Sequence, residues 1–275
     1  MAGFCPRFFV GEVGAGRFPE EEAWPAALGD SSLSDSSPDL TGQEFALSRT
    51  DAHHALRVLR LRRGDMCEVV VGSAVYAATL QPGGDTVKVS LVRRLEELAA
   101  GPRYRHQVGI VQAVVKPSLI DQVIEKGTEV GASFFLLAPS AGSTRWEHVM
   151  KEERLTRWRR IAQEAAKQSK RLTVPVVGFS SSLDEAFHNL RHAGVLSVVL
   201  QPDAVCGLRE LLEEQAVSPA RIALWVGPEG GWSPGEVKDF ASRGMKPARL
   251  GRSVLRTETA GPVAVAVTRL VLGDW

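Results

Sequence analysis

Apolar residues recur along the chain in short runs, and the pattern of these runs changes near residue 100. Upstream of that point, three runs of β-like composition are separated by turns that contain Gly-Ser and Pro-Gly-Gly-Asp. These runs are residues 66–72, 74–80 and 86–92. Short strands at this spacing favour a small β-barrel. We therefore place a first domain at residues 1–100.

Three further segments of this first domain have a recognisable pattern. Residues 4–13 predict an opening strand that carries Arg7 beside a proline. Residues 52–65 begin as a short helix. Its apolar face is expected to hold Ala55, Val58 and Leu59. Residues 14–42 are serine-rich toward their end and contain too little apolar surface to order themselves, so a mobile loop is expected there.

Downstream of residue 100, near-continuous apolar runs alternate with helical patterns. The apolar runs are residues 108–115, 134–139, 174–177, 195–200 and 221–226. Runs of this kind are typical of strands in a parallel sheet that is covered on both faces. The helical segments are residues 119–131, with Ser118 as the expected cap, 151–171, 182–190 and 208–215. The alternation predicts an α/β domain with a mostly parallel sheet over residues 101–275.

The long helix expected at 151–171 is amphipathic. Its apolar stripe consists of Leu155, Trp158, Ile161, Ala162 and Ala165. Its other faces carry the basic residues Lys151, Arg154, Arg157, Arg159, Arg160, Lys167, Lys170 and Arg171. Such a face fits contact with RNA, and it fits a solvated helix surface equally well.

Composition narrows the classes of protein. A chain of 275 residues with 44% hydrophobic residues can bury the cores of two domains. No stretch approaches the ~20 apolar residues of a membrane span, and the first residues do not resemble a secretory signal, so we expect a cytoplasmic protein. The three cysteines are far apart and lack metal-type spacing, which favours free thiols and no metal site.

The formal net charge of +1 does not by itself indicate binding to nucleic acid. The distribution of the basic residues along the chain is more informative. Four arginines cluster in and just after the helical pattern at 52–65. They are Arg57, Arg60, Arg62 and Arg63. Isolated basic residues are usually solvated, whereas a cluster within a small barrel favours contact with the phosphates of RNA.

A first glycine loop, residues 227–231, follows the apolar run at 221–226. Its sequence is Gly-Pro-Glu-Gly-Gly, and Ser233, Pro234 and Glu236 then form the signature of a helix start with a capping box. The loop lacks the GxxxxGK[ST] and GxGxxG patterns of nucleotide phosphate sites. Glycines here fit a tight strand-to-helix turn, and they also fit close approach of the backbone to a ligand.

A second loop, residues 250–259, follows another apolar turn. Thr257 or Thr259 can cap the last helix, and Glu258 suits the positive end of its dipole. Arg256 opposes that dipole, so we expect its guanidinium to face a phosphate, a carboxylate or a developing negative charge. Ligands collect at the carboxyl ends of parallel strands, and both loops lie at such ends. The two loops therefore predict one shared pocket.

Taken together, these motifs resemble the RsmE family of ribosomal RNA methyltransferases, within the SPOUT superfamily. The matching segments are residues 6–10, 54–60, 126–131, 157–175, 226–236 and 250–260, so the resemblance covers nearly the whole chain in order. The chain departs from the usual pattern at Arg252, Lys167, Gly261 and Pro262. Because proline has no N–H, Pro262 favours a helix that begins near Thr259.

The resemblance implies a PUA-like RNA-binding β-barrel at the N-terminus and a SPOUT domain with a trefoil knot at the C-terminus. It also implies a homodimer that uses S-adenosyl-L-methionine to methylate N3 of a uridine in 16S rRNA of the small ribosomal subunit. The cofactor-binding residues would be Leu200, Gln201, Pro202, Gly227, Glu229, Gly230, Gly231, Leu250, Gly251 and Leu255. The RNA-binding residues would be Arg7, His54, Arg57, Arg60, Lys116 and Arg171.

The chemistry of uracil suggests which side chains act on the substrate. N3 carries an imide proton, which must leave before or while the methyl group arrives. Glu229 and Glu258 are the two carboxylates that could accept it, and Arg256 could stabilise the uracil anion or hold a neighbouring phosphate. Trp232 is expected to pack against the pocket wall. Two alternatives stay open: a methyltransferase acting on another base or on a ribose 2′-hydroxyl, and a non-catalytic RNA-binding or ribosome-assembly factor.

Overall fold

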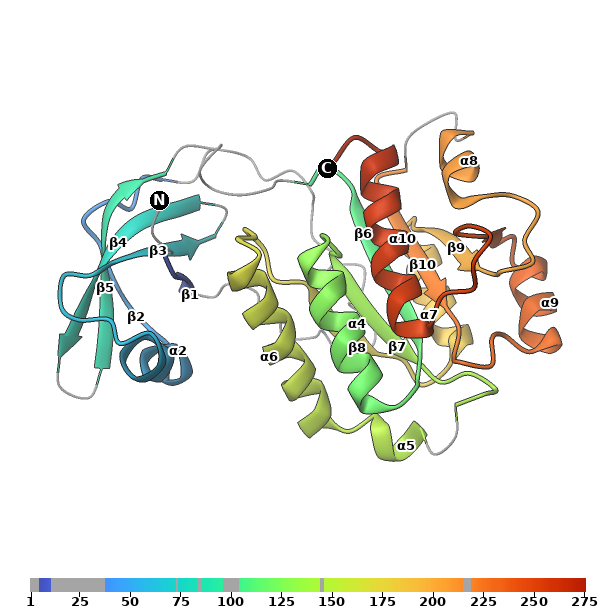
Figure 1. The fold of residues 1–275 in the computed structure, drawn as a ribbon, viewed down its shortest axis with the longest axis horizontal. Coiled ribbons are helices and arrows are strands. Elements are labelled where there is room, and N and C mark those ends of the chain that lie inside the picture. The colour runs from blue at the N-terminus through green and yellow to red at the C-terminus, as the bar shows by residue number, and fades with distance from the viewer. Residues whose placement is uncertain are drawn as a thin grey trace. The chain divides into compact units, whose positions relative to one another are not determined.

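The computed structural model describes residues 5–10, 38–72, 74–83, 86–95, 104–143, 146–214 and 219–275. Two compact units account for these residues (Figure 1). One unit contains the described residues from 5 to 95 together with Ala166–Val174, and the other contains Tyr104–Ala165 and the described part of Pro175–Trp275. The boundary between the two domains at residue 100 stays a prediction. Of the mobile loop expected at 14–42, residues 14–37 lie outside the described residues.

The first unit is built on a five-stranded sheet in the order β1-β3-β4-β5-β2. The strands are β1 Arg7–Val10, β2 Glu44–Ala46, β3 Met66–Val71, β4 Ala74–Gly83 and β5 Thr86–Arg94. β1 runs parallel to β3, the other pairs are antiparallel, and a register shift lies between Ala77 and Ala78 of β4. The predicted β3, β4 and β5 are confirmed. Among the described strands, β1 and β2 form open edges, so the sheet is a curled half-barrel and not a closed barrel.

The helical segment of this unit begins earlier than its sequence suggests. Helix α2, Arg49–His53, starts at the cap Ser48, whose hydroxyl accepts the N–H of Asp51. It continues as one π-helical stretch, η2, His54–Val58. Ala55 is buried as expected, but Val58 is 60% exposed, because the wider π turn rotates it away from the core. That placement of Val58 was wrong.

Segment Ala166–Val174 is fastened to this sheet by buried charges. The Lys167 ammonium bonds the Asp51 carboxylate, with side chains only 9% and 2% exposed. The Arg7 guanidinium pairs with Glu68 at 2.8 Å and donates to the carbonyl of Arg171 at 3.2 Å. We expected Arg7 and Arg171 to contact RNA, yet they are only 4% and 2% exposed. Their burial corrects that assignment, because a phosphate cannot reach them in this conformation.

The second unit contains a six-stranded sheet in the order β11-β9-β10-β6-β7-β8, in which every neighbouring pair is parallel. The strands are β6 Gln107–Ala113, β7 Phe134–Ala138, β8 Val176–Phe179, β9 Leu196–Leu200, β10 Arg221–Val226 and β11 Lys246–Ala248. This confirms the α/β fold with a parallel sheet. The trefoil knot stays a prediction.

Helices cover both faces of the parallel sheet (Figure 1). They are α4 Pro117–Glu129, α5 Trp146–Val149, α6 Glu152–Gln168, α7 Leu183–His192, α8 Leu208–Glu213, α9 Pro234–Ser242 and α10 Thr257–Val271. On one face, Val111, Phe134 and Trp225 form a core with Phe187 of α7 and Phe240 of α9. On the other face, α10 lies against α4, and these two helices are side by side in Figure 1.

Glycines let the helices of that second face approach the sheet closely. A side chain on Gly261 of α10 would come within 3.0 Å of Ile110, and one on Gly127 of α4 within 2.6 Å of Phe135.

Two further expectations can be compared with the burial of side chains. The predicted amphipathic stripe of α6 is confirmed, since Leu155 and Trp158 are 3% and 1% exposed. Burial raises the pKa of the Cys67 thiol to about 12, as expected for an idle thiol.

Two helix starts differ from expectation. Helix α4 begins at Pro117 with Lys116 at its cap, so Ser118 is the second helical residue and does not cap it. Helix α10 begins at Thr257 and not near Thr259. The Arg256 carbonyl accepts the N–H groups of both Thr259 and Ala260, at 3.0 and 2.9 Å, which closes the first turn there. Pro262 thus lies inside the helix.

A buried cluster joins the last residues of the second unit to His106, the residue just before β6. The Asp274 carboxylate, 1% exposed, accepts hydrogen bonds from the backbone N–H of His106 at 3.0 Å and from the guanidinium of Arg269 at 2.7 Å. Burial raises the pKa of Asp274, but the hydrogen bonds from His106 and the charge of Arg269 outweigh it, and the pKa is lowered below its usual value.

We therefore expect Asp274→Asn to lower the free energy of unfolding at pH 7 by about 1.5–3 kcal/mol. Because the pKa of Asp274 is lower in the folded state, its carboxylate stabilises the fold at pH values above the unfolded-state pKa of about 3.9. This stabilisation is lost as the pH falls through the folded-state pKa. The difference between wild type and variant should hence shrink below about pH 4. Urea unfolding at pH 7 and at pH 3.5 checks this, and a difference independent of pH contradicts it.

Candidate active site

A cavity of about 940 Å³ opens at the carboxyl ends of β9, β10 and β11 in the second unit. Every residue expected to bind a cofactor lines it. These are Leu200, Gln201, Pro202, Gly227, Glu229, Gly230, Gly231, Leu250, Gly251 and Leu255. Arg256 and Glu258 line it as well. The structure thus brings both glycine loops to one pocket, as their positions at strand ends predicted, while the role of each residue in binding stays a prediction.

The first glycine loop is held by a tight turn and by the start of the helix that follows it. Gly231 adopts φ +74°, a left-handed conformation that favours glycine, and its N–H bonds the carbonyl of Pro228 at 2.9 Å. Ser233 and Glu236 form the predicted capping box at the start of α9, with contacts of 3.3 and 2.7 Å. The Glu236 carboxylate also accepts the N–H of Ala141 at 2.8 Å. Tight-turn geometry therefore explains Gly231.

Gly230 and Gly251 need a different explanation. A side-chain carbon added at either position would meet no protein atom within 4 Å, although both residues line the cavity. Neither glycine has the positive φ that would require it. A side chain there would project into open space, so glycine at these positions keeps the backbone accessible to a ligand.

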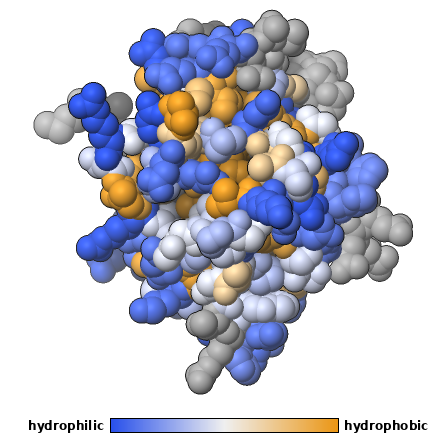
Figure 2. All heavy atoms as spheres, turned by 90° about the vertical axis from the view of Figure 1, so that its right-hand side faces the viewer, coloured by the Kyte–Doolittle hydropathy of each residue, from blue (hydrophilic) through white to orange (hydrophobic). Residues whose placement is uncertain are grey.

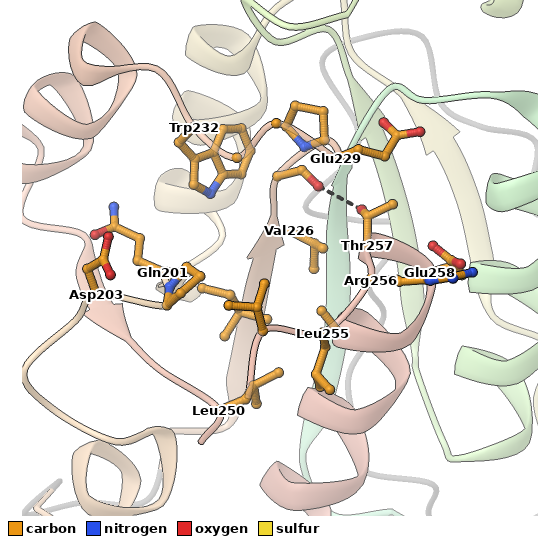
Figure 3. A pocket seen from close by; sticks show the side chains of 18 of the residues that line it. Gln201, Asp203, Val226, Glu229, Trp232, Leu250, Leu255, Arg256, Thr257 and Glu258 are labelled. Atoms are coloured by element: carbon orange, nitrogen blue, oxygen red, sulfur yellow. Dashed lines mark hydrogen bonds between the residues drawn. The ribbon is translucent and has the colours of Figure 1, made fainter. Parts of the chain in front are cut away.

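The cavity is apolar in its middle and polar at two opposite sides (Figure 3). Val226, Leu250 and Leu255 form the apolar part, while Gln201 and Asp203 lie across from Arg256 and Glu258 (Figure 3). Trp232 packs edge-on against Phe240, with ring centroids 5.0 Å apart, which confirms its expected place in the wall. The shape suits a flat, partly apolar ligand with polar groups at both ends.

Arg256 and Glu258 are the sequence neighbours of Thr257 at the start of α10, and both side chains lie on the same side of the cavity in Figure 3. Arg256 is exposed, and neither side chain makes a hydrogen bond or an ion pair with another described residue. The same is true of the Glu229 carboxylate, which is directed away from the middle of the cavity in Figure 3. Two carboxylates and one guanidinium are thus available at the rim, and Glu258 is the one on the same helix turn as Arg256.

The remaining residues expected to bind RNA do not share one unit. His54, Arg57 and Arg60 belong to the first unit, where His54 is half-buried and both arginines are exposed. Arg60 adopts φ +56° at the end of η2, a conformation rare for a side-chain-bearing residue. Lys116 is exposed in the second unit, where it caps α4 three residues before the cavity residue Leu119.

Sequence reasoning missed two contributors to the site. Asp203 lines the cavity and directly follows the expected segment 200–202. Its polar side chain, two residues after Gln201, is a sequence signal that could have identified it as a pocket residue. Gln112 lies beneath the cavity on β6 with no exposed surface. Its one sequence signal is that it is the only polar side chain within the apolar run 108–115.

Comparisons with known proteins agree with this geometry. A protein-family model described as an RNA methyltransferase domain matches residues 102–269. The protein of Mycobacterium bovis named ribosomal RNA small subunit methyltransferase E is 31% identical over 249 residues, covering 88% of this chain and 91% of that protein. The Synechocystis protein of the same name is 29% identical, over 82% of this chain and 73% of its own.

Solved structures share the fold. Ribosomal RNA small subunit methyltransferase E of Neisseria gonorrhoeae, solved with S-adenosyl methionine bound, superposes with a TM-score of 0.75 at 23% identity, covering 97% of this chain and 98% of its own. A methyltransferase of Legionella pneumophila, in complex with the same cofactor, gives a TM-score of 0.75 at 22% identity over 98% of both chains.

Proposed function

The chain belongs to the ribosomal RNA small subunit methyltransferase E family, and we propose that it transfers a methyl group from S-adenosylmethionine to N3 of a uridine in 16S rRNA. One observation carries the proposal. A cavity built from two glycine-bearing loops places the guanidinium of Arg256 and the carboxylate of Glu258 on the rim of an apolar pocket, where neither group is paired with another described residue. The small ribosomal subunit is the partner that this substrate implies.

The residues present fit the cofactor. Val226, Leu250 and Leu255 offer an apolar surface for the adenine, and Gly230 and Gly251 leave space where a side chain would otherwise stand. We assign the polar side around Gln201 and Asp203 to the hydroxyl-bearing part of the molecule, since amide and carboxylate oxygens accept hydrogen bonds from hydroxyls. When bound, the cofactor supplies an electrophilic methyl group on a sulfonium.

The chain's own residues have three tasks. The pocket loops hold the methyl donor and the base in line, because positioning dominates a transfer that needs little else from the protein. Glu258 accepts the N3 proton of the uracil on its carboxylate, which leaves the nitrogen lone pair free to form the new bond. Arg256 stabilises the negative charge that develops on the uracil oxygens. Glu229, directed away from the middle of the cavity, is assigned to the cofactor side.

The experiment that tests the proposal measures methyl transfer from labelled cofactor to small subunits that lack the modification and to naked rRNA. We expect transfer to at least one of them, together with cofactor binding in calorimetry. Absence of cofactor binding would favour the alternative of a non-catalytic RNA-binding or assembly factor. Transfer to another base or to a ribose would favour the other alternative.

We assign RNA binding in the first unit to the exposed arginines in and just after η2, Arg57 and Arg60. Phosphate contacts release counterions, so the affinity for RNA should fall steeply with salt. Arg57→Ala and Arg60→Ala should each lower the slope of log K against log salt by about 1. Arg209→Ala is the matched control, because Arg209 is exposed on α8 of the other unit and pairs with Glu213. Filter binding at several salt concentrations checks this, and equal slopes for all variants contradict it.

We also propose that the protein acts as a homodimer in the cytoplasm. Figure 2, which views the side where α8 and α9 lie, shows apolar surface among hydrophilic residues. Among the described residues, Val205, Val254 and Leu270 are 94%, 77% and 65% exposed. We place the interface at exposed apolar surface, because contiguous apolar patches mark interaction sites. No described helix is long and apolar enough to cross a bilayer.

A further inference from the structure

Gln112 is a polar side chain in a place where a strand between two helix layers normally has an apolar one. It has 0% exposed surface, and it lies on β6 between Val111 and Ala113, which are equally buried. Its side chain is on the face of the sheet that α10 covers, the same face as Ile110 two residues earlier. A buried amide is costly unless its hydrogen bonds are made, so its partners indicate its purpose.

The amide of Gln112 is the start of a short relay of hydrogen bonds. Its Nε2 donates to the hydroxyl of Thr257 at 3.0 Å and to the carbonyl of Ala113 at 3.0 Å. The Thr257 hydroxyl in turn donates to the carbonyl of Gly227 at 2.7 Å, the bond drawn in Figure 3. The carbonyl of Val226 lies 3.5 Å from the same Nε2. Two carbonyls on this side of the amide fix its orientation, because the opposite orientation would set oxygen against oxygen.

The relay is not explained by stability alone. With Nε2 so oriented, the Gln112 Oε1 is buried and has no hydrogen-bond partner among the described residues. An unsatisfied buried oxygen is destabilising, and an apolar side chain of similar shape would avoid it. The amide therefore has a role in the pocket that offsets the loss of stability caused by its unpaired oxygen.

The relay joins the two loops that form the pocket. Gly227 begins the first glycine loop, and Thr257 is the first residue of α10, at the end of the second. Arg256 and Glu258 are the immediate neighbours of Thr257, and the Arg256 side chain does not cap the helix. Thr257 is 6% exposed, so its hydroxyl is the anchor that ties this turn of backbone to the first loop.

We propose that Gln112 and Thr257 are positioning residues that hold Arg256 and Glu258 in register with the cofactor-binding loop. The inference rests on the proposed function. Gln112 lies beneath the cavity and does not line it, so it acts through Thr257. Because misplacement of reacting groups by about 1 Å can cost about a hundredfold in rate, a lost bond at this position should slow the chemical step more than it weakens binding.

The test compares Gln112→Met, Thr257→Val and Thr257→Ser with wild type. Methionine keeps the length of the side chain and removes the bond from Gln112 to Thr257. Valine keeps the shape of threonine and removes both bonds of the Thr257 hydroxyl, whereas serine retains the hydroxyl. We expect kcat to fall about 10- to 100-fold in the Met and Val variants, with Kd for S-adenosylmethionine and KM for RNA changed less than about threefold. Thr257→Ser should restore most of kcat. Gln112→Met and Thr257→Ser should keep a melting temperature near that of wild type, whereas Thr257→Val, which leaves the Gly227 carbonyl without its donor, should melt a few degrees lower.

A second measurement does not depend on activity. Hydrogen exchange of peptides covering residues 226–232 and 255–260 should be faster in Gln112→Met and Thr257→Val than in wild type and Thr257→Ser. Unchanged exchange in both peptides overturns the relay, even if wild type transfers no methyl group and the proposed function fails. Wild-type kcat in Gln112→Met, or equal losses for serine and valine at position 257, also overturns it.

Discussion

Glu258→Gln is expected to lower kcat for methyl transfer by about 10²–10⁴-fold, the range typical of a lost general base. Glutamine matches glutamate in size but cannot accept the N3 proton. Binding of the cofactor should be unchanged, because the carboxylate acts on the base and not on the methyl donor. Rates measured with saturating cofactor and RNA check this.

The matched control is Glu229→Gln, since Glu229 lines the same cavity and is equally free of partners among the described residues. We expect that variant to keep kcat within about threefold. Raising the pH should partly restore the Glu258→Gln variant, because hydroxide then removes the imide proton without help. Full activity in Glu258→Gln at neutral pH would remove the assignment, and loss only in Glu229→Gln would transfer it to Glu229.

Lys167→Met is expected to destabilise the first unit by about 3–5 kcal/mol. The substitution leaves the Asp51 carboxylate, 2% exposed, without its ammonium partner. One Asp51 oxygen already has no hydrogen-bond partner in the described structure, so the charge has little other compensation. Urea unfolding followed by a probe in this unit gives the difference.

Two controls separate the lost pair from lost packing. The double variant Lys167→Met with Asp51→Leu removes both charges and should recover most of the stability, because an apolar pair is often as stable as a buried ion pair. Lys151→Met, on an exposed residue just before α6, should change stability by less than about 0.5 kcal/mol. A single Lys167→Met variant as stable as wild type contradicts this account.

The sequence was most informative where the determining interactions are local. Five of the six strands of the parallel sheet followed from near-continuous apolar runs, and the capping box at Ser233 and Glu236 predicted the start of α9. The pocket followed from the same logic, because both glycine loops directly follow short strands whose carboxyl ends lie at one edge.

It was least informative where a partner distant in sequence decides. Arg7 looked like an RNA ligand, but its guanidinium bonds Glu68 and the carbonyl of Arg171, both more than 60 residues away in the sequence. Arg171, the second such residue, is itself buried. Helix α10 starts before Thr259 because the first glycine loop holds Thr257. Gln112 gave almost no signal, since a single amide in an apolar run does not reveal which hydroxyl it will meet.

The central claim is that the chain methylates uracil at N3, and nucleoside analysis of the product tests it most directly. Small subunits lacking the modification are incubated with the protein and labelled S-adenosylmethionine, the rRNA is digested, and the labelled nucleoside is identified. The account predicts that the label is found in 3-methyluridine and that the Glu258→Gln variant produces almost none. Label in a 2′-O-methylated nucleoside or in another base, or no label despite cofactor binding, would contradict it.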